Sequence, residues 1–357
     1  AMAPSQENVL PKGSLKEFEA EDLAFAVGFL RNGKIEEAAG IYRRIVDRKP
    51  NHADALHGLA VSHAFLGDLE YAFAFAKRSC AVAMTSQRRI TLANIWLAEG
   101  KVSNASSSYA LAIRRDPMSA VGHYNIGNAH FMLGDAVSAR TSYMAAIDRE
   151  PRYFKALHNL GLLMDSTGAI VEAKEWMKRA VDVRPNDARA LHAMGLLYIK
   201  LGQWAKAEAT LLDLIKVRPK HPDVYAKLGN LAFRRSDYER AGAYYLTALD
   251  YAPGHVEALT NLALLDWCRG SAASCNAQLR LALTIDPEYY PALYNLALTR
   301  LSQGRIEECL RYYNRAKAAM DDSPLARVQI FNLGMALAEL DEIDEREVPE
   351  EITPTAT

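Results

Sequence analysis

Apolar residues recur at helical spacing through most of the chain, and the stretch 154–187 shows the pattern clearly. Leu157, Leu160 and Met164 lie at i, i+3 and i+7, which places them on one face of a helix. Small and apolar residues around Ala173 repeat this spacing after a break. The stretch therefore predicts two amphipathic helices in succession.

Glycine and proline separate these helices at fixed places. Gly168 lies between the two runs, where a helix end favours a residue at positive φ. Pro185 ends the second run, because proline lacks an amide donor and clashes with the preceding turn. The pattern returns every 34 residues, with prolines at 117, 151, 185, 219, 253 and 287 and glycines at 100, 134, 168, 202, 270 and 304, Ser236 filling the one gap. A fixed period of this length predicts a helical solenoid.

Two columns of the repeat contain only small residues. When residue 154 is position one, the eighth position of successive repeats is Ala26, Ala60, Ala93, Gly127, Gly161, Gly195, Gly229, Ala263 and Ala297. The twentieth position is Ala38, Ala72, Ala105, Ala139, Ala173, Ala207, Ala241, Cys275 and Cys309. Such columns indicate where the two helices of a repeat cross closely.

The chain resembles the tetratricopeptide repeat (TPR) family over about residues 19–323. The resemblance lies in the 34-residue helix–turn–helix unit, with small residues at positions eight and twenty, a large apolar or aromatic residue at position twenty-four and proline near the end. It implies an all-α, right-handed superhelical solenoid of about nine helix–turn–helix TPR units, followed by a C-terminal capping helix.

Four segments are expected along the chain. Residues 1–13 predict a disordered lead, and 14–323 the TPR solenoid of nine repeats, in which the second repeat is one residue short near 80–90. Residues 324–340 predict a capping helix, and the acidic residues 341–357, with two prolines, predict a disordered tail. The short junction at 80–90 is either a bend or a harmless deletion in a loop.

Composition excludes several classes of function. The net charge is −1, with 42 basic and 43 acidic residues, which argues against a nucleic-acid partner. No apolar run approaches the length of a membrane span. The four cysteines lack metal-ligand spacing, and two occupy the small-residue column, so we expect reduced thiols, no metal, no cofactor and a cytoplasmic location.

Motifs for catalysis are not found in the sequence. The segment 28–34, GFLRNGK, matches most of a phosphate-binding loop, but Ile35 follows it and the segment lies at a helix–helix turn. The sequence holds no GxSxG, HExxH or GxGxxG motif. We therefore predict that the chain is not an enzyme.

The resemblance also implies a binding groove. In TPR proteins the first helix of each repeat lines a concave groove with positions two, five, six, nine and twelve to thirteen. Asparagines occupy position six at Asn125, Asn159, Asn261, Asn295 and, after a three-residue shift, Asn332, and position nine at Asn94, Asn128 and Asn230. An amide side chain donates and accepts at once, so these residues suit the backbone of an extended peptide.

Charged and aromatic residues are distributed unevenly among the groove positions. Repeats five to seven carry the basic residues Lys155, Arg189, Lys200, Lys227 and Arg234, together with His158 and His192. Repeats three, four, eight and nine carry more apolar and aromatic residues, namely Tyr124, Phe131, Trp267, Tyr294 and Leu298. The middle therefore favours an acidic segment and the ends favour apolar anchors.

We interpret the chain as a protein–protein interaction module that binds an extended peptide in the groove and acts as an adaptor or scaffold. The alternative is an architectural subunit of a larger complex, or a homo-oligomer, assembled through the convex face and the solenoid ends.

Overall fold

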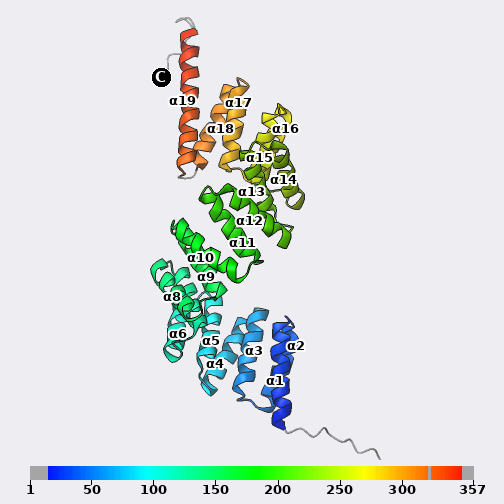
Figure 1. The fold of residues 1–357 in the computed structure, drawn as a ribbon, viewed down its shortest axis with the longest axis vertical. Coiled ribbons are helices and arrows are strands. Elements are labelled where there is room, and N and C mark those ends of the chain that lie inside the picture. The colour runs from blue at the N-terminus through cyan, green and yellow to red at the C-terminus, as the bar shows by residue number, and fades with distance from the viewer. Residues whose placement is uncertain (1–14, 321–322, 348–357) are drawn as a thin grey trace, which may run out of the picture. The chain divides into compact units, whose positions relative to one another are not determined.

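The computed structural model of the protein describes residues 15–320 and 323–347, which form nineteen helices and no strand (Figure 1). The helices are α1 (Leu15–Arg31), α2 (Ile35–Arg48), α3 (Ala53–Leu66), α4 (Leu69–Val82), α5 (Ser86–Ala98), α6 (Val102–Arg115), α7 (Ala120–Met132), α8 (Ala136–Arg149), α9 (Phe154–Ser166), α10 (Ile170–Val183), α11 (Ala188–Lys200), α12 (Trp204–Val217), α13 (Pro222–Arg234), α14 (Tyr238–Tyr251), α15 (Val256–Cys268), α16 (Ala272–Ile285), α17 (Tyr290–Ser302), α18 (Ile306–Ala319) and α19 (Pro324–Glu347). The predicted all-α repeat fold is confirmed.

The helices belong to two compact units, one ending at Pro185 and the other beginning at Asn186. Within each unit, every odd-numbered helix packs against the even-numbered helix that follows it, except α19, which is the last described helix. We call the odd-numbered members first helices and the even-numbered members second helices. Each described first helix from α7 to α17 begins at position one of its repeat.

The predicted turn column is confirmed at the ends of the first helices. Gly168 has φ of +81°, and Ala169 donates its backbone N–H to Met164 at 2.9 Å, which satisfies a carbonyl at the helix end. Ser236 fills the gap in the glycine column with φ of +60° and is the one non-glycine residue at positive φ among the described residues. The turn geometry is therefore kept where glycine is absent, in a region that L-residues visit at a cost.

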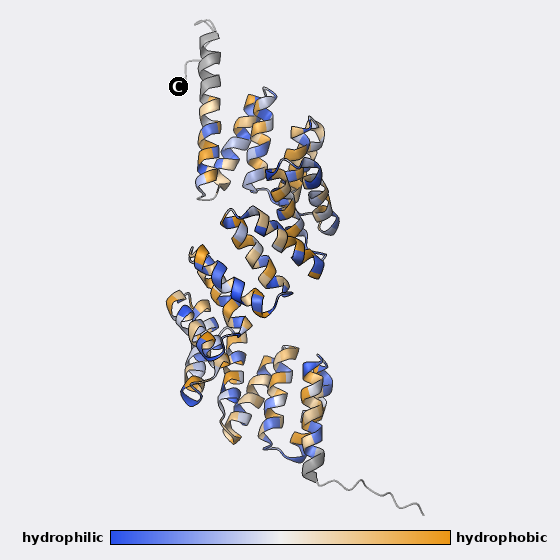
Figure 2. Cartoon of the chain, in the orientation of Figure 1, coloured by the Kyte–Doolittle hydropathy of each residue, from blue (hydrophilic) through white to orange (hydrophobic). Residues whose placement is uncertain are grey.

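The core of each unit is a seam between helix layers. In the first unit Tyr42, Ile45 and Leu59 are buried together, and in the second unit Leu259 and Leu279 form an equivalent cluster. Orange and blue residues alternate along the helices in Figure 2, as expected for amphipathic helices that each bury one face. None of the described helices is long and apolar enough to cross a membrane.

The short junction between the second and third repeats is held by one arginine. Arg88 is buried, and it donates to the Asp54 carboxylate at 2.6 Å and to the Ala83 carbonyl at 2.7 Å. Thr85 caps α5 by accepting from the Arg88 backbone N–H at 3.2 Å. The short junction therefore has specific polar contacts of its own, and the boundary between the two compact units lies at Pro185.

The C-terminal helix differs from its prediction at one end. It begins at Pro324 as expected but continues to Glu347, past the predicted end at 340. Residues 341–347 contain good helix formers such as Glu and Arg, and the first residue restricted by a following proline is Val348. The predicted lead at 1–13 and the end of the predicted tail, 348–357, lie outside the described residues.

One face of α19 has no partner among the described residues. Ala326, Ile330, Leu333 and Leu337 are buried, with Ile330 and Leu333 packed in clusters with residues of α17 and α18. The opposite face exposes the apolar residues Leu325, Val328, Phe331 and Met335. A second helix that would follow α19 is not among the described residues.

Candidate functional site

The asparagines at positions nine and six form a repeated hydrogen-bonded set with a tyrosine at position twenty-four. In the first set, the Tyr109 hydroxyl donates to Asn94 Oδ1 at 2.5 Å, and Asn125 Nδ2 donates to the same oxygen at 3.5 Å. We call each such Asn–Tyr–Asn set a rung. A rung joins a first helix to its own second helix and to the next first helix.

Two further rungs have the same connectivity. In the second rung, Tyr143 donates to Asn128 Oδ1 at 2.7 Å and Asn159 Nδ2 donates to it at 2.9 Å. In the third, Tyr245 donates to Asn230 Oδ1 at 2.9 Å and Asn261 Nδ2 donates to it at 2.7 Å. The first and second rungs lie in the first unit and the third rung lies in the second unit.

Glycine at position eight makes room for the tyrosine in two of the rungs. A Cβ at Gly127 would lie 2.7 Å from the Tyr143 ring, and one at Gly229 would lie 2.4 Å from the Tyr245 ring. Tyr143 and Tyr245 are each almost fully buried. The small-residue column therefore positions the rung as well as the helix crossing.

Burial keeps the rung tyrosines protonated. Desolvation raises the pKa of Tyr143 to about 12 and raises the pKa of Tyr109 and Tyr245 as well. Each hydroxyl therefore stays a donor, and each position-nine asparagine receives two donated hydrogen bonds on its Oδ1. In the first rung this leaves Nδ2 of Asn94 and Oδ1 of Asn125 without a hydrogen bond to another described residue.

The rungs differ in the further hydrogen bonds that their asparagine side chains make. The structure shows no hydrogen bond from Nδ2 of Asn94 or Asn128 to any described residue. In the second rung, Asn159 also donates to the Tyr124 hydroxyl at 3.2 Å, and its Oδ1 lies 3.4 Å from Nδ1 of buried His158. The position-nine amide donors of the first two rungs thus have no hydrogen-bond partner among the described residues, and Asn94 is exposed.

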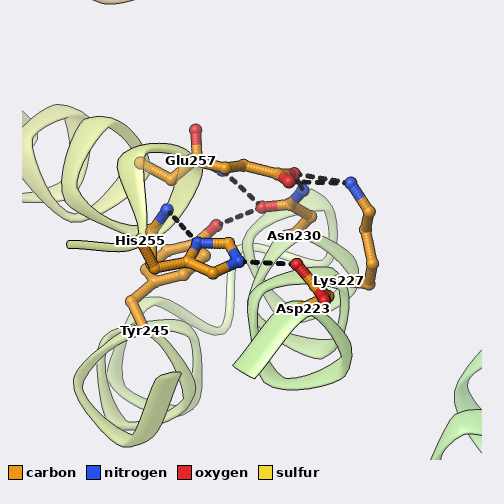
Figure 3. Close-up of polar contacts among 8 residues, drawn as sticks. Asp223, Lys227, Asn230, Tyr245, His255 and Glu257 are labelled. Atoms are coloured by element: carbon orange, nitrogen blue, oxygen red, sulfur yellow. Dashed lines mark hydrogen bonds and ion pairs between the residues drawn. The ribbon is translucent and has the colours of Figure 1, made fainter. Parts of the chain in front are cut away.

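The third rung is closed by an acidic side chain (Figure 3). Asn230 Nδ2 donates to Glu257 Oε1 at 2.9 Å, and Lys227 Nζ lies 2.8 and 2.9 Å from the two Glu257 oxygens. Next to it, His255 Nε2 lies 2.9 Å from Asp223 Oδ1. Burial, the largest single influence, would raise the pKa of Asp223, but the hydrogen bond to His255 and the charges of the neighbouring histidines together outweigh it and the pKa is lowered.

The predicted basic centre is largely engaged within the chain. Lys155 is exposed in the first unit, and the other basic residues belong to the second. Arg189 lies 3.4 Å from Asp187, and Lys227 pairs with Glu257. His192 packs against His221 with 5.0 Å between ring centroids, and burial, followed by the charge of His221, lowers the pKa of His192.

Arg234 makes a different kind of contact. Its guanidinium lies 4.0 Å above the centre of the Trp204 ring, at the first residue of α12. No hydrogen bond or ion pair joins Arg234 to another described residue. Trp204 was not a predicted groove residue, because it is the first residue of a second helix and not part of a first helix.

The predicted residues near the C-terminus are less accessible than expected. Trp267 and Tyr294 are half-buried against the core clusters of their repeats. Asn295 joins no rung, because the preceding repeat has Leu264 and Leu279 at positions nine and twenty-four. These aromatic side chains contribute to packing more than to an exposed anchor surface.

The three-residue shift used to place Asn332 is wrong. Helix α19 begins at Pro324, which is position one of a further repeat without any shift from Tyr290. Asn332 therefore occupies position nine and not position six, and its side chain is exposed.

Clefts lie between successive first helices at the predicted groove positions. One cleft of about 360 Å³ in the first unit lies between α3 and α5 and is lined by Val61, Phe65, Thr91 and Asn94 among others. In the second unit a cleft of about 260 Å³ occupies the equivalent place between α11 and α13. Each cleft lies directly beside the position-nine asparagine of a rung.

These features define a helical-repeat protein whose first helices carry hydrogen-bonded asparagine amides, and sequence comparison identifies its family. Tetratricopeptide repeat models match residues 23–85, 192–256 and 227–265, and also 154–187 and 290–319. The chain belongs to the tetratricopeptide repeat family. Members of this family are generally non-catalytic, and the fold supports a protein–protein interaction or scaffold role in general.

Solved structures show the same fold. A tetratricopeptide repeat protein from Parabacteroides merdae matches with a TM-score of 0.57 at 19% identity, covering 70% of this chain and 98% of that chain. The Cut9–Hcn1 hetero-tetramer of the APC/C matches with a TM-score of 0.53 at 14% identity, over 87% and 57%. Pseudomonas aeruginosa pilF matches with a TM-score of 0.51 at 18% identity, over 58% and 94%.

At these identities the likeness concerns the fold alone. No curated protein matches the chain.

Proposed function

We propose that the protein binds an extended segment of a protein partner along its first helices and so acts as an adaptor or scaffold in complex assembly. The observation that carries this proposal is the repeated rung. Each rung fixes its two asparagines through a buried tyrosine hydroxyl, so the amides are held in place before a ligand arrives. Such preorganisation reduces the cost of binding.

The groups left over on a rung complement a peptide unit. In the first two rungs the position-nine asparagine offers an N–H donor to a backbone carbonyl, and in the first and third rungs the position-six asparagine offers an oxygen to a backbone N–H. Contacts of this kind are independent of the partner's side chains. The clefts beside the rungs would then supply the side-chain selectivity, as pockets do in other modes of extended-peptide recognition.

The two units would favour different side chains. The cleft of the first unit is lined by Val61, Ala64, Phe65 and Ala98, which suits an apolar anchor. The cleft of the second unit has basic residues at its edge, which suits an acidic segment. The proposal involves no catalysis, no cofactor and no nucleic acid.

A cytoplasmic location is part of the same proposal. All four cysteines are unpaired, and three of them are buried. Unpaired thiols are the usual state of cysteine in a reducing compartment.

The alternative is an architectural role through the ends of the repeat array, including self-association. The exposed apolar face of α19, where Phe331 is 66% exposed, favours this second function. The two functions can be distinguished by the variant that abolishes the interaction. A groove variant would lose the partner in the first case, whereas an α19 variant such as Phe331→Ser would lose the assembly in the second.

The test is affinity capture from native cell extract with the triple variant Asn125→Ala, Asn159→Ala and Asn261→Ala. These substitutions leave the hydrogen bond from each rung tyrosine to its position-nine asparagine in place, so the fold should persist by circular dichroism. Each lost hydrogen bond contributes about 0.5–1.5 kcal/mol, so the partner should bind at least roughly tenfold more weakly. Asn104→Ala, an exposed change on second helix α6, is the matched control.

Equal capture by the triple variant and the control would refute groove binding. Partner loss in both variants would point to a non-specific effect of asparagine removal and would also count against the proposal.

A further inference from the structure

The cleft between α11 and α13 combines apolar walls with a positioned cation. Leu196 and Ile199 of α11 and Leu231 of α13 form its apolar sides, and Arg234 lies one helical turn beyond Leu231. Its volume of about 260 Å³ suits a single side chain and not a larger ligand. It occupies the same repeat positions as the cleft of the first unit, where Ala98 stands in the place of Arg234.

Arg234 is held in place without using its hydrogen-bond donors. The guanidinium stacks on the Trp204 ring at 4.0 Å, and no described residue accepts a hydrogen bond from it. A guanidinium that stacks through its face keeps the N–H groups of its edge available, in the fork geometry that matches a carboxylate. The neighbouring cation Lys227 is not available in the same way, because its ammonium is paired with the Glu257 carboxylate. That carboxylate also accepts a hydrogen bond from Asn230 Nδ2.

We propose that this cleft binds a glutamate side chain of an extended partner segment. The glutamate carboxylate accepts from the edge of Arg234, and its two methylene groups lie against Leu196, Ile199 and Leu231. Aspartate is too short to fill the apolar part and reach the arginine together, and glutamine lacks the charge that the guanidinium selects. This inference rests on the proposed peptide-binding function and names the side chain that one of its subsites takes.

The test uses a host peptide of alternating valine and serine with one central guest residue. The peptide is acetylated and amidated, so the guest supplies its only ionisable group. Fluorescence polarisation compares glutamate, aspartate and glutamine guests on the whole chain. Hydrogen bonds to charged groups are the stronger ones, so the glutamate peptide should bind about tenfold more tightly than the glutamine peptide.

Arg234→Gln should remove this preference and leave the affinity for the glutamine peptide unchanged. Arg280→Gln, an exposed arginine on second helix α16, removes the same charge elsewhere in the unit and should leave the preference intact. Added salt should reduce the preference, because the carboxylate and guanidinium meet at a partly open site.

Two results separate failure of this inference from failure of the proposed function. If the peptides bind but glutamate is not preferred, or Arg280→Gln abolishes the preference as fully as Arg234→Gln does, the glutamate assignment is wrong and backbone binding stands. If no guest peptide binds at all, both the assignment and the peptide-binding function are refuted.

Discussion

Adding one methyl group at Gly229 should destabilise the protein, although alanine favours helices. The new Cβ would lie 2.4 Å and 2.6 Å from Cε1 and Cδ1 of Tyr245, whereas ordinary contacts lie at 3.4–4 Å. The aromatic ring is rigid and buried, so it must be displaced as a whole. Its displacement also weakens the hydrogen bond to Asn230 in the third rung.

The magnitude follows from three contributions of known sign. Replacing glycine by alanine inside a helix stabilises by about 1 kcal/mol. Overpacking a core costs about 1–3 kcal/mol, and losing the tyrosine hydrogen bond costs about 0.5–1.5 kcal/mol. Gly229→Ala should therefore lower the free energy of unfolding by about 2 kcal/mol.

Gly161→Ala is the matched control at the same position of another repeat. Its Cβ would meet Met177 Cε at 3.0 Å, which is the flexible end of a side chain that can move aside. Here the helix-forming preference of alanine prevails, and the unfolding free energy should stay equal or rise by up to about 1 kcal/mol.

The unfolding free energy of each helix pair can be measured by urea denaturation followed by hydrogen-exchange mass spectrometry, which reports α13–α14 and α9–α10 separately. Separate values are needed because the parts of a repeat protein need not unfold together. The reasoning is refuted if Gly229→Ala is as stable as Gly161→Ala, since both carry the same substitution and differ only in the atom that the methyl group meets.

Three further predictions follow from the groove and the core. In native protein near neutral pH, a thiol reagent should modify Cys268 alone. The other three cysteines are buried, and burial raises the pKa of each thiol. Modification of a second thiol before unfolding would contradict this prediction. Glu257→Gln should release the Lys227 ammonium and increase the affinity for the host peptide with a glutamate guest about fivefold, and an unchanged affinity would show that the ion pair does not compete with ligand. Burial lowers the pKa of His192 and His221 from 6.5, so the unfolded state binds more protons than the folded state just below that pH. The free energy of unfolding should therefore fall as the pH drops from about 7 to about 5.5. A variant with glutamine at both positions should lose this pH dependence, and an unchanged slope would refute the prediction.

The helix pairs could be predicted because several local signals coincide in every repeat. Glycine at the turn, proline after the second helix and small residues at the crossing all return with the same period, and each acts through nearby backbone geometry. The end of α19 was harder to predict. No glycine or proline stops that helix before Pro349, and the acidic residues that suggested disorder are also helix formers.

The rung was only half predicted. The asparagines were identified, but position twenty-four was predicted only as a large apolar or aromatic residue, without a hydrogen-bonding role. The sequence does hold a signal, because Asn94, Asn128 and Asn230 at position nine are each accompanied by tyrosine at position twenty-four and asparagine at position six of the next repeat. Asn94, Tyr109 and Asn125 are one such set, whereas Asn295 follows a repeat that lacks both partners.

Charge pairing across repeats could not be predicted from positions alone. Lys227 and Glu257 both fall on the groove, but whether they meet each other or a ligand depends on side-chain conformations and on the spacing of two helices. The stacking of Arg234 on Trp204 likewise joins two helices whose relation no local pattern determines. The sequence therefore gives the place of the basic residues and not which of them keeps its donors available.

The most direct test of peptide binding on the rungs is to observe their free amide donors. The protein would be labelled with ¹⁵N-asparagine, and the side-chain amide NMR signals of Asn94 and Asn128 would be followed while the host peptide with a glutamate guest is added. The account predicts that both signals shift as the peptide binds, while the signal of Asn104 on second helix α6 stays in place. Unchanged signals of Asn94 and Asn128 with the peptide bound, or shifts confined to second helices, would contradict the account.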